Sequence, residues 1–181
     1  SAPYVAMTVR VLREAEVSVE KPESDPYTVD PSGSCKLDYS VPGDYSSAAF
    51  PLVGAILTGG NLTIDGLVEG DAQADRRILE ILDDFGADIT WTDDRLYFTG
   101  REQIPGFTLD ASKCPDLVPI LTVLGSFADG AVSIENIAHL ANKESNRIEL
   151  PCRELRKLGV DATPHSDRIT IEPTAGPYEG G

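Results

Sequence analysis

The feature that most restricts the fold of this chain is an internal repeat. Residues 44–67 hold apolar residues three and four apart, then the pair Gly59-Gly60, then alternating apolar residues. Residues 116–137 follow the same plan, while 76–98 and 146–171 each suggest an amphipathic helix, a Gly, a strand, an Asp-Arg turn and a second strand. Spacing of three and four is typical of helices, and alternation is typical of strands.

The repeat predicts an α/β (α+β) fold built from βαβαββ units. We expect two complete units within residues 41–175 and part of a third within residues 1–40, which offer an amphipathic helix, a strand and hairpin-like material. Residues 1–40 would then end a first domain, residues 41–175 would belong to a second, and residues 176–181 would form a flexible tail. The absent initiator Met and the incomplete first unit suggest a segment of a larger repeat protein.

The charge of the chain limits the partners that it can bind. Acidic residues outnumber basic ones 30 to 15, the net charge is −15, and the acids are spread along the sequence. A surface this negative repels phosphate backbones, so we expect no nucleic-acid partner. Only 5 of the basic residues are Lys, and Asp (17) exceeds Glu (13). Such a composition is typical of proteins from a salt-loaded cytoplasm, and it favours a halophilic source over an ordinary acidic domain.

The sequence offers no support for a membrane or metal role. The longest apolar runs, such as 117–124, are too short to span a bilayer. Cys35, Cys114 and Cys152 form no CxxC pair, and the two His residues show no ligand spacing. We therefore expect no disulfide framework and no metal, and this use of cysteine fits a reducing cytoplasm.

Candidate site residues stand where the predicted helices begin. Asp44, with Ser46 and Ser47, is interpreted first as an N-cap that satisfies free amides and second as part of an anion site. Asp116 opens the equivalent helix of the second unit. It is either another cap or a carboxylate base at the mouth of a cleft, kept ionised by the helix dipole. Spacing alone leaves these two interpretations of Asp116 equal.

The segment 143–147 concentrates charge at the start of a further helix. Lys143 and Glu144 are adjacent, and such a pair can move a proton if packing changes either pKa. Arg147 is predicted in the first helical turn, where a cation opposes the helix dipole, a cost that makes sense if it binds an anion. The ordinary alternative is a solvated run of charges. Since Asp116 and this segment lie at corresponding helix starts of one unit, the fold could bring them together.

These segments together resemble the enolpyruvyl transferase family and, within it, the EPSP synthases (3-phosphoshikimate 1-carboxyvinyltransferases). The likeness covers essentially the whole chain, and the pattern KES[DN]R with an upstream PD is highly specific in combination. The matching pieces, in family order, are SAPYVAMT (1–8), PGDYSSAAF (42–50), CPDLVPILTVLGSFADG (114–130) and IAHLANKESNRI (137–148).

The resemblance implies an activity in the shikimate pathway of aromatic amino acid biosynthesis. Enzymes of this kind transfer the enolpyruvyl group of phosphoenolpyruvate to the 5-hydroxyl of shikimate-3-phosphate and release phosphate, without a metal or cofactor. The resemblance further implies a cytoplasmic, monomeric parent enzyme, in which two domains of three βαβαββ units close over the substrates.

The resemblance also implies which residues hold the substrates. Ser1 and Tyr4 match positions that bind the phosphate of shikimate-3-phosphate. Arg147 matches an anion clamp on phosphoenolpyruvate. His139 stands where some relatives carry an Asn that touches the sugar-like substrate.

Three further residues match catalytic positions of the family. Asp116 matches the residue proposed to accept the 5-hydroxyl proton, and Lys143 matches the lysine that contacts that hydroxyl. Glu144 matches the acid proposed to protonate the methylene carbon. Carbon protonation needs a positioned acid and attack needs a base, so these residue types suit the reaction.

Several parts of the family pattern are absent from this chain. It has no Lys-Ser-…-Arg motif, no Ser-Ser-Gln loop and no late Asp-His-Arg segment. We therefore expect the isolated chain to bind the substrates weakly and to turn over nothing detectable. Two alternatives are a UDP-N-acetylglucosamine enolpyruvyl transferase, against which the KESNR signature argues, and a non-catalytic interaction domain that reuses the repeat.

Overall fold

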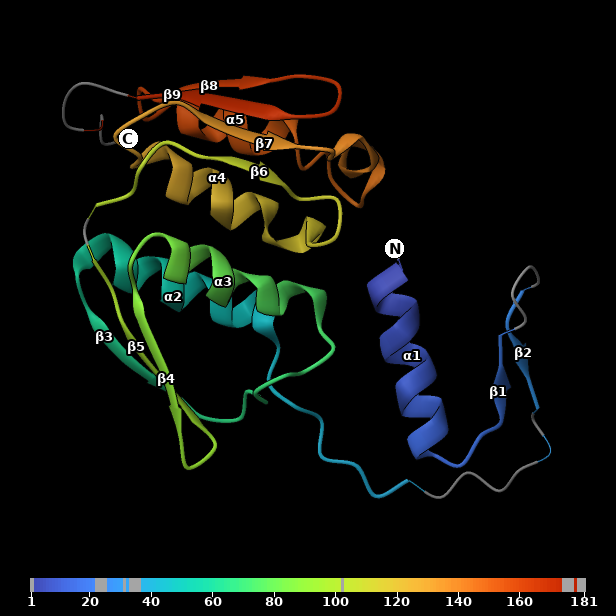
Figure 1. Cartoon of the computed structure of the whole chain (residues 1–181). Helices are drawn as coiled ribbons and strands as arrows, with labels where there is room; N and C mark the ends of the chain where they lie inside the picture. Colours follow the sequence, from blue (N-terminus) through green and yellow to red (C-terminus); the bar gives the residue numbers. More distant parts are fainter. Residues whose placement is uncertain are drawn as a thin grey trace.

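The computed structural model describes residues 2–21, 26–30, 32, 37–101, 103–173 and 178. Its helices and strands form two parts, which we call the arm (the described residues of 2–30) and the body (44–173) (Figure 1). Of the helices that the structure describes, none is both long enough and apolar enough to cross a membrane.

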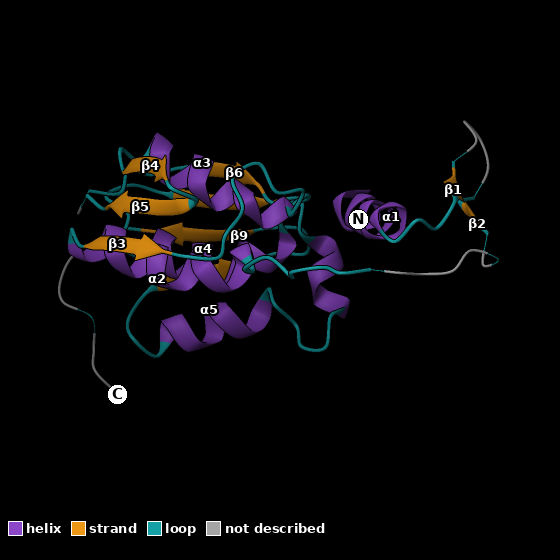
Figure 2. Cartoon of the chain, turned by 90° about the horizontal axis from the view of Figure 1, so that it is seen from below, coloured by secondary structure: helices purple, strands orange, loops and turns teal. Residues whose placement is uncertain are grey.

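The arm contains helix α1 (Ala2–Glu14) and the short strands β1 (Val19–Glu20) and β2 (Thr28–Val29), which pair antiparallel. The expected helix and the strand after it are present, but this strand itself pairs with β2, and no separate hairpin is seen among the described residues of 2–40. Residues 37–44 connect the arm to the body without helix or strand. Figure 2 shows α1 beside one end of the body, with the hairpin farther out.

The first unit of the body begins with a helix. The three strands of this unit form an antiparallel sheet in the order β3-β5-β4. Asp93 and Asp94 turn the chain between β4 and β5 with φ values of 51° and 60°, a left-handed conformation that Asp tolerates. The elements are α2 (Tyr45–Thr58), β3 (Asn61–Ile64), the 3-10 turn η1 (Ala74–Arg76), α3 (Arg77–Asp84), β4 (Asp88–Thr92) and β5 (Arg95–Thr99).

The second unit is a complete βαβαββ unit. Its four-stranded sheet has the order β6-β7-β9-β8, with β6 parallel to β7 and the other pairs antiparallel. The elements are β6 (Thr108–Asp110), the 3-10 turn η2 (Pro115–Leu117), α4 (Val118–Ser126), β7 (Val132–Glu135), the 3-10 turn η3 (Ala138–Asn142), α5 (Glu149–Arg156), β8 (Asp161–Pro164) and β9 (Ile169–Glu172).

The predicted α/β class and the repeat are confirmed, but the count of two complete units is not. The first unit lacks a leading strand, because the described residues 37–44 that precede α2 pair with no other strand. The division into domains at residue 40 stays a prediction. Of the predicted tail 176–181, only Tyr178 lies within the described residues, and its ring meets Phe127 edge-on.

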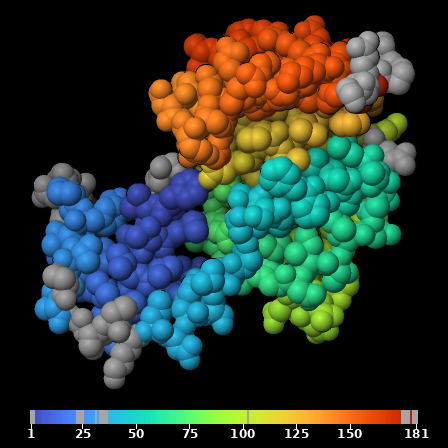
Figure 3. Space-filling model, turned by 180° about the vertical axis from the view of Figure 1, so that it is seen from behind, coloured from blue at the N-terminus to red at the C-terminus, as the bar shows by residue number. Residues whose placement is uncertain are grey.

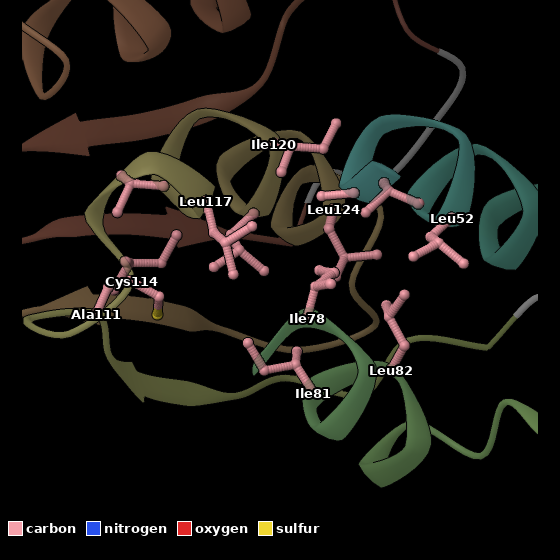
Figure 4. Packing of buried hydrophobic residues seen from close by; sticks show 14 of the residues in the cluster. Leu52, Ile78, Ile81, Leu82, Ala111, Cys114, Leu117, Ile120 and Leu124 are labelled. Atoms are coloured by element: carbon pink, nitrogen blue, oxygen red, sulfur yellow. The ribbon is translucent and has the colours of Figure 1, made fainter. Parts of the chain in front are cut away.

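One apolar core joins the two units. In Figure 1 the helices lie between the two sheets, and α2 of the first unit lies against α4 of the second. Figure 4 shows side chains of α2, α3 and α4 converging on a shared interior. Because buried residues of both units belong to one cluster, the body is a single packed piece. Fully buried members include Leu52, Ile56, Ile78, Leu82, Leu117, Leu121 and Leu124.

Candidate active site

A charged hollow of about 690 Å³ opens where the helices of the body begin. It lies at the amino-terminal ends of α2, α4 and α5, so three separate segments of the chain supply its walls. The predicted residues 116, 143, 144 and 147 all line it, so the structure brings them together. The lining consists of Ser46, Ser47, Phe50, Asp116, Pro119, Lys143, Glu144, Ser145, Arg147, Leu150, Pro151 and Glu154.

Asp116 lies at the centre of the polar contacts. Its carboxylate accepts hydrogen bonds from the Tyr4 hydroxyl (2.9 Å) and from Nη1 of Arg147 (2.6 Å). Nζ of Lys143 lies 3.7 Å from the same carboxylate. No side chain caps η2 or α4. Asp116 is therefore not a helix cap, and the cleft interpretation of this residue fits the geometry.

Arg147 bridges two carboxylates. Its guanidinium contacts Asp116 and also Glu144, while its own side chain is only 23% exposed. The hydrogen bond from Arg147 lowers the pKa of Glu144, and the same bond raises the pKa of Arg147. An anion that binds this guanidinium therefore competes with two carboxylates that already contact it.

The start of α5 differs slightly from the expectation. The helix begins at Glu149, so Arg147 precedes it instead of lying in its first turn. Oδ1 of Asn146 accepts the amides of Ile148 and Glu149 at 3.0 Å, which is the geometry of an N-cap. This cap fixes the turn that directs Arg147 toward the hollow.

Tyr4 of the arm contacts Asp116 but is not among the residues that line the hollow. Its hydroxyl donates to Asp116 and lies 3.2 Å from Oδ2 of Asp75. Burial raises the pKa of Tyr4, and the negative charges of the two aspartates raise it further. Tyr4 is thus a permanent hydrogen-bond donor. Figure 3 shows the arm, in dark blue, against the body near the junction of the two units.

Two other predicted substrate contacts are not brought into this cluster. Ser1 lies outside the described residues. His139, on η3, is exposed and is not part of the lining of the charged hollow. The contacts of Ser1 and His139 with a substrate stay predictions.

Asp75 is the residue that sequence reasoning missed. Its side chain is 5% exposed, and Oδ1 has no hydrogen-bond partner among the described residues. Burial raises the pKa of Asp75 to about 6, and the charge of Asp116 adds to the effect. In the sequence it is one acidic residue before a helix, like many capping residues, and its contact with Tyr4 spans 71 positions.

Asp44 is the helix cap that its position predicts. Its carboxylate accepts the backbone amides of Ser46 (3.0 Å) and Ser47 (3.2 Å) and both of their hydroxyls. Burial opposes its ionisation, but the hydroxyls of Ser47 and Ser46 together with these amides lower the pKa of Asp44. The structural interpretation of this segment is thus the one that the contacts support.

The described residues hold no group of three or more His, Cys, Asp and Glu side chains arranged to bind a metal. Cys114 and Cys152 are buried free thiols, and burial raises the pKa of both, that of Cys152 to about 11. Cys35 lies outside the described residues. Neither described thiol is an activated nucleophile.

Comparison with known proteins gives one consistent family. The family model described as EPSP synthase (3-phosphoshikimate 1-carboxyvinyltransferase) matches residues 1–179. The 3-phosphoshikimate 1-carboxyvinyltransferase of Methanothermobacter thermautotrophicus is 39% identical over 173 residues, which are 95% of this chain and 41% of that protein. That of Archaeoglobus fulgidus is 39% identical over 182 residues, which are 99% of this chain and 43% of that protein.

A solved structure agrees with these sequence matches. The EPSP synthase of Acinetobacter baumannii superposes with a TM-score of 0.75 at 26% identity, covering 96% of this chain and 43% of that one. The chain therefore spans about two fifths of the length of the relatives that it matches.

Proposed function

The chain belongs to the EPSP synthase family, and we propose that its charged hollow is part of the site where such an enzyme joins phosphoenolpyruvate to shikimate-3-phosphate. The observation that carries this proposal is the convergence of Tyr4, Asp116, Lys143, Glu144 and Arg147. Arg147 contacts both the proposed base, Asp116, and the proposed acid, Glu144, and Lys143 lies 3.7 Å from Asp116. A base, an acid and two cations are the groups that the reaction needs.

The cations hold the anionic reactants. Arg147 offers a planar guanidinium that suits a carboxylate or phosphate, and Lys143 supplies a second positive charge beside Asp116. With both substrates bound, Asp116 accepts the proton of the attacking hydroxyl, and Lys143 keeps that hydroxyl oriented toward it. The contact of Tyr4 with the phosphate of the sugar-like substrate stays a prediction, because the Tyr4 hydroxyl proton is shared between Asp116 and Asp75.

Glu144 is suited to be the acid that protonates the methylene carbon, once its hydrogen bond with Arg147 is broken. In this structure Arg147 favours the ionised form of Glu144, because their hydrogen bond lowers the pKa of Glu144. An anion that takes over the guanidinium removes this stabilisation, and the pKa of Glu144 rises. Substrate binding itself thus prepares the proton donor.

Kinetics of the complete enzyme that contains this segment test the proposal. Glu144→Gln should lower kcat by a factor of about 10² to 10⁴, the usual contribution of a general acid. Arg147→Ala should raise KM for phosphoenolpyruvate by at least about tenfold, the equivalent of 1.4 kcal/mol. Arg153→Ala is the matched control, because Arg153 is an exposed cation of α5 that pairs with Glu154. Unchanged kinetics for Glu144→Gln and Arg147→Ala would refute the assignment.

The isolated chain should lack turnover, since it spans about two fifths of the length of its relatives. Calorimetric titration should show weak binding of shikimate-3-phosphate and none of a UDP-sugar. Tight binding of the UDP-sugar would favour the sister transferase, and product formation by the isolated chain would contradict the expected inactivity.

We also infer that the protein works in a salt-rich cytoplasm. The net charge of −15 and the low content of Lys support this inference. The melting temperature should fall when KCl is dialysed from molar concentration to below a few tenths molar, because repulsion between the acidic side chains is then unscreened. Equal melting temperatures in both conditions would contradict it.

A further inference from the structure

Asp75 is a buried charged side chain in an unusual position. It lies on η1, it is 5% exposed, and its Oδ1 has no hydrogen-bond partner among the described residues. Its other oxygen, Oδ2, lies 3.2 Å from the Tyr4 hydroxyl. An ionised carboxylate buried in this way is costly unless something compensates it. The arrangement is stable when Asp75 carries a proton.

The Tyr4 hydroxyl stands between two carboxyl groups and has only one proton to give. Asp116 lies 2.9 Å away on one side, and Asp75 lies 3.2 Å away on the other. When Asp75 is protonated, it donates to the Tyr4 oxygen and Tyr4 donates to Asp116. When Asp75 is ionised, it competes with Asp116 for the same hydroxyl proton.

The groups that face Asp75 come from every neighbouring element. Asp116 of η2 and Asp44 at the start of α2 oppose its ionisation, and Lys143 after η3 favours it. Tyr4 of α1 donates to it, and the thiol of Cys114, whose pKa is raised, stays neutral beside it. Burial outweighs the favourable contacts and raises the pKa of Asp75 to about 6. The carboxyl therefore changes its charge close to neutral pH.

We propose that Asp75 is a positioning residue for Asp116 and acts through the Tyr4 hydroxyl. Loss of the Asp75 proton draws the Tyr4 hydroxyl away from Asp116 and leaves Asp116 a stronger base, while its return restores the hydrogen bond to Asp116. The kinetic part of this inference rests on the proposed role of Asp116, but the exchange of the hydrogen bond does not.

The exchange is measurable in the 181-residue chain without substrate. With ¹³Cζ-labelled tyrosine, and Tyr4→Phe to assign the resonance, the Tyr4 signal should titrate with a midpoint near pH 6. Asp75→Asn should abolish this titration, because the amide stays neutral and donates to the Tyr4 oxygen at every pH. Asp83→Asn is the control, since it removes an exposed carboxylate of the same unit, and it should leave the titration unchanged.

The complete enzyme tests the consequence for catalysis. Asp75→Asn should keep KM within about twofold and lower kcat at pH 7.5 by about threefold to tenfold, because Asp116 stays hydrogen-bonded and is a weaker base. The limb of the kcat–pH profile near pH 6 should disappear. A residue with a purely structural role would not move that limb.

The outcomes separate this inference from the proposed function. A Tyr4 signal that does not titrate in the folded wild-type chain overturns the shared hydrogen bond. A titrating signal together with an unchanged kcat–pH profile in Asp75→Asn overturns the positioning role. If Asp116→Asn itself leaves kcat unchanged, the proposed function fails while the hydrogen-bond exchange stands on the resonance data.

Discussion

Each unit of the body has an aspartate where its first helical segment begins, Asp44 before α2 and Asp116 in η2. The two aspartates make different contacts. Asp44 folds back on its own helix and accepts four donors from Ser46 and Ser47. Asp116 accepts from Tyr4 and Arg147 and lies beside Lys143, and these donors come from other elements of the fold.

The difference follows from the backbone around each aspartate. Asp44 is an extended residue directly before α2, so its side chain can reach the free amides of the first turn. Asp116 lies inside a 3-10 turn that continues into α4, after Pro115, and its side chain makes no cap. A repeat thus preserves the placement of a residue, while the local backbone decides whether the residue serves its own helix or a site.

The largest expected effect concerns catalysis in the complete enzyme. Asp116→Asn should lower kcat by a factor of about 10² to 10⁴, because the proposed general base is lost. Asp44→Asn keeps an oxygen acceptor for the cap and should change kcat by no more than about twofold. Steady-state kinetics on both folded variants measure the contrast. Equal losses would remove the distinction between the two aspartates.

The second expected effect asks whether the two units are energetically separate. Leu124→Ala in the second unit should lower the free energy of unfolding by about 2 to 5 kcal/mol, because Leu124 is fully buried. The single Trp of the chain, Trp91, lies in β4 of the first unit. Its fluorescence and the far-UV circular dichroism should shift together in urea. A Trp91 transition that stays in place would show that the units unfold independently.

A smaller effect belongs to the cap. Asp44→Ala should lower the free energy of unfolding by about 1 kcal/mol at pH 7. The folded state lowers the pKa of Asp44 below its ordinary value of 3.8, so this stabilisation is present above that pH and is lost as the pH falls below it. Urea unfolding at pH 7 and at pH 3 measures the change. Asp44→Asn is the control. It should keep most of the stability but lose the part of the pH dependence that comes from ionisation of Asp44.

The smallest effect compares one glycine of α2 with one of α4. A Cβ on Gly54 would meet no atom within 4 Å, so Gly54→Ala should raise the free energy of unfolding by about 0.5 to 1 kcal/mol. A Cβ on Gly125 would lie 3.0 Å from Cγ1 of Val132 and 3.1 Å from Cδ1 of Ile171, so Gly125→Ala should be destabilising. Chemical denaturation measures the free energy of unfolding of both variants. The comparison tests how closely neighbouring residues pack against each glycine.

The sequence predicts the elements and the main cluster for physical reasons. Apolar spacing reveals the repeated helices and strands, and the repeat places Asp116 and the segment 143–147 at helix starts of one unit. Helix starts of one unit that pack on the same sheet lie at the same end, so their side chains meet. The convergence around the hollow is therefore predictable before any coordinates.

The sequence does not predict the features that depend on distant packing. Asp75 and Tyr4 are 71 positions apart, and no periodic pattern connects a residue of the arm with a 3-10 turn of the body. The absent leading strand of the first unit has a similar cause. A strand forms only beside a partner strand, and residues 37–44 have none among the described residues, although the Gly43 amide donates to the Gly66 carbonyl.

The contact of Tyr4 with Asp75 and Asp116 couples the position of the arm to both units of the body. One hydroxyl group touches both units at once, and the arm that carries it is tethered through residues 37–44. A displacement of α1 therefore changes the lengths of these two hydrogen bonds. Small movements of α1 thus alter the hydrogen bond to the carboxylate of Asp116, which lies 112 positions after Tyr4 in the chain.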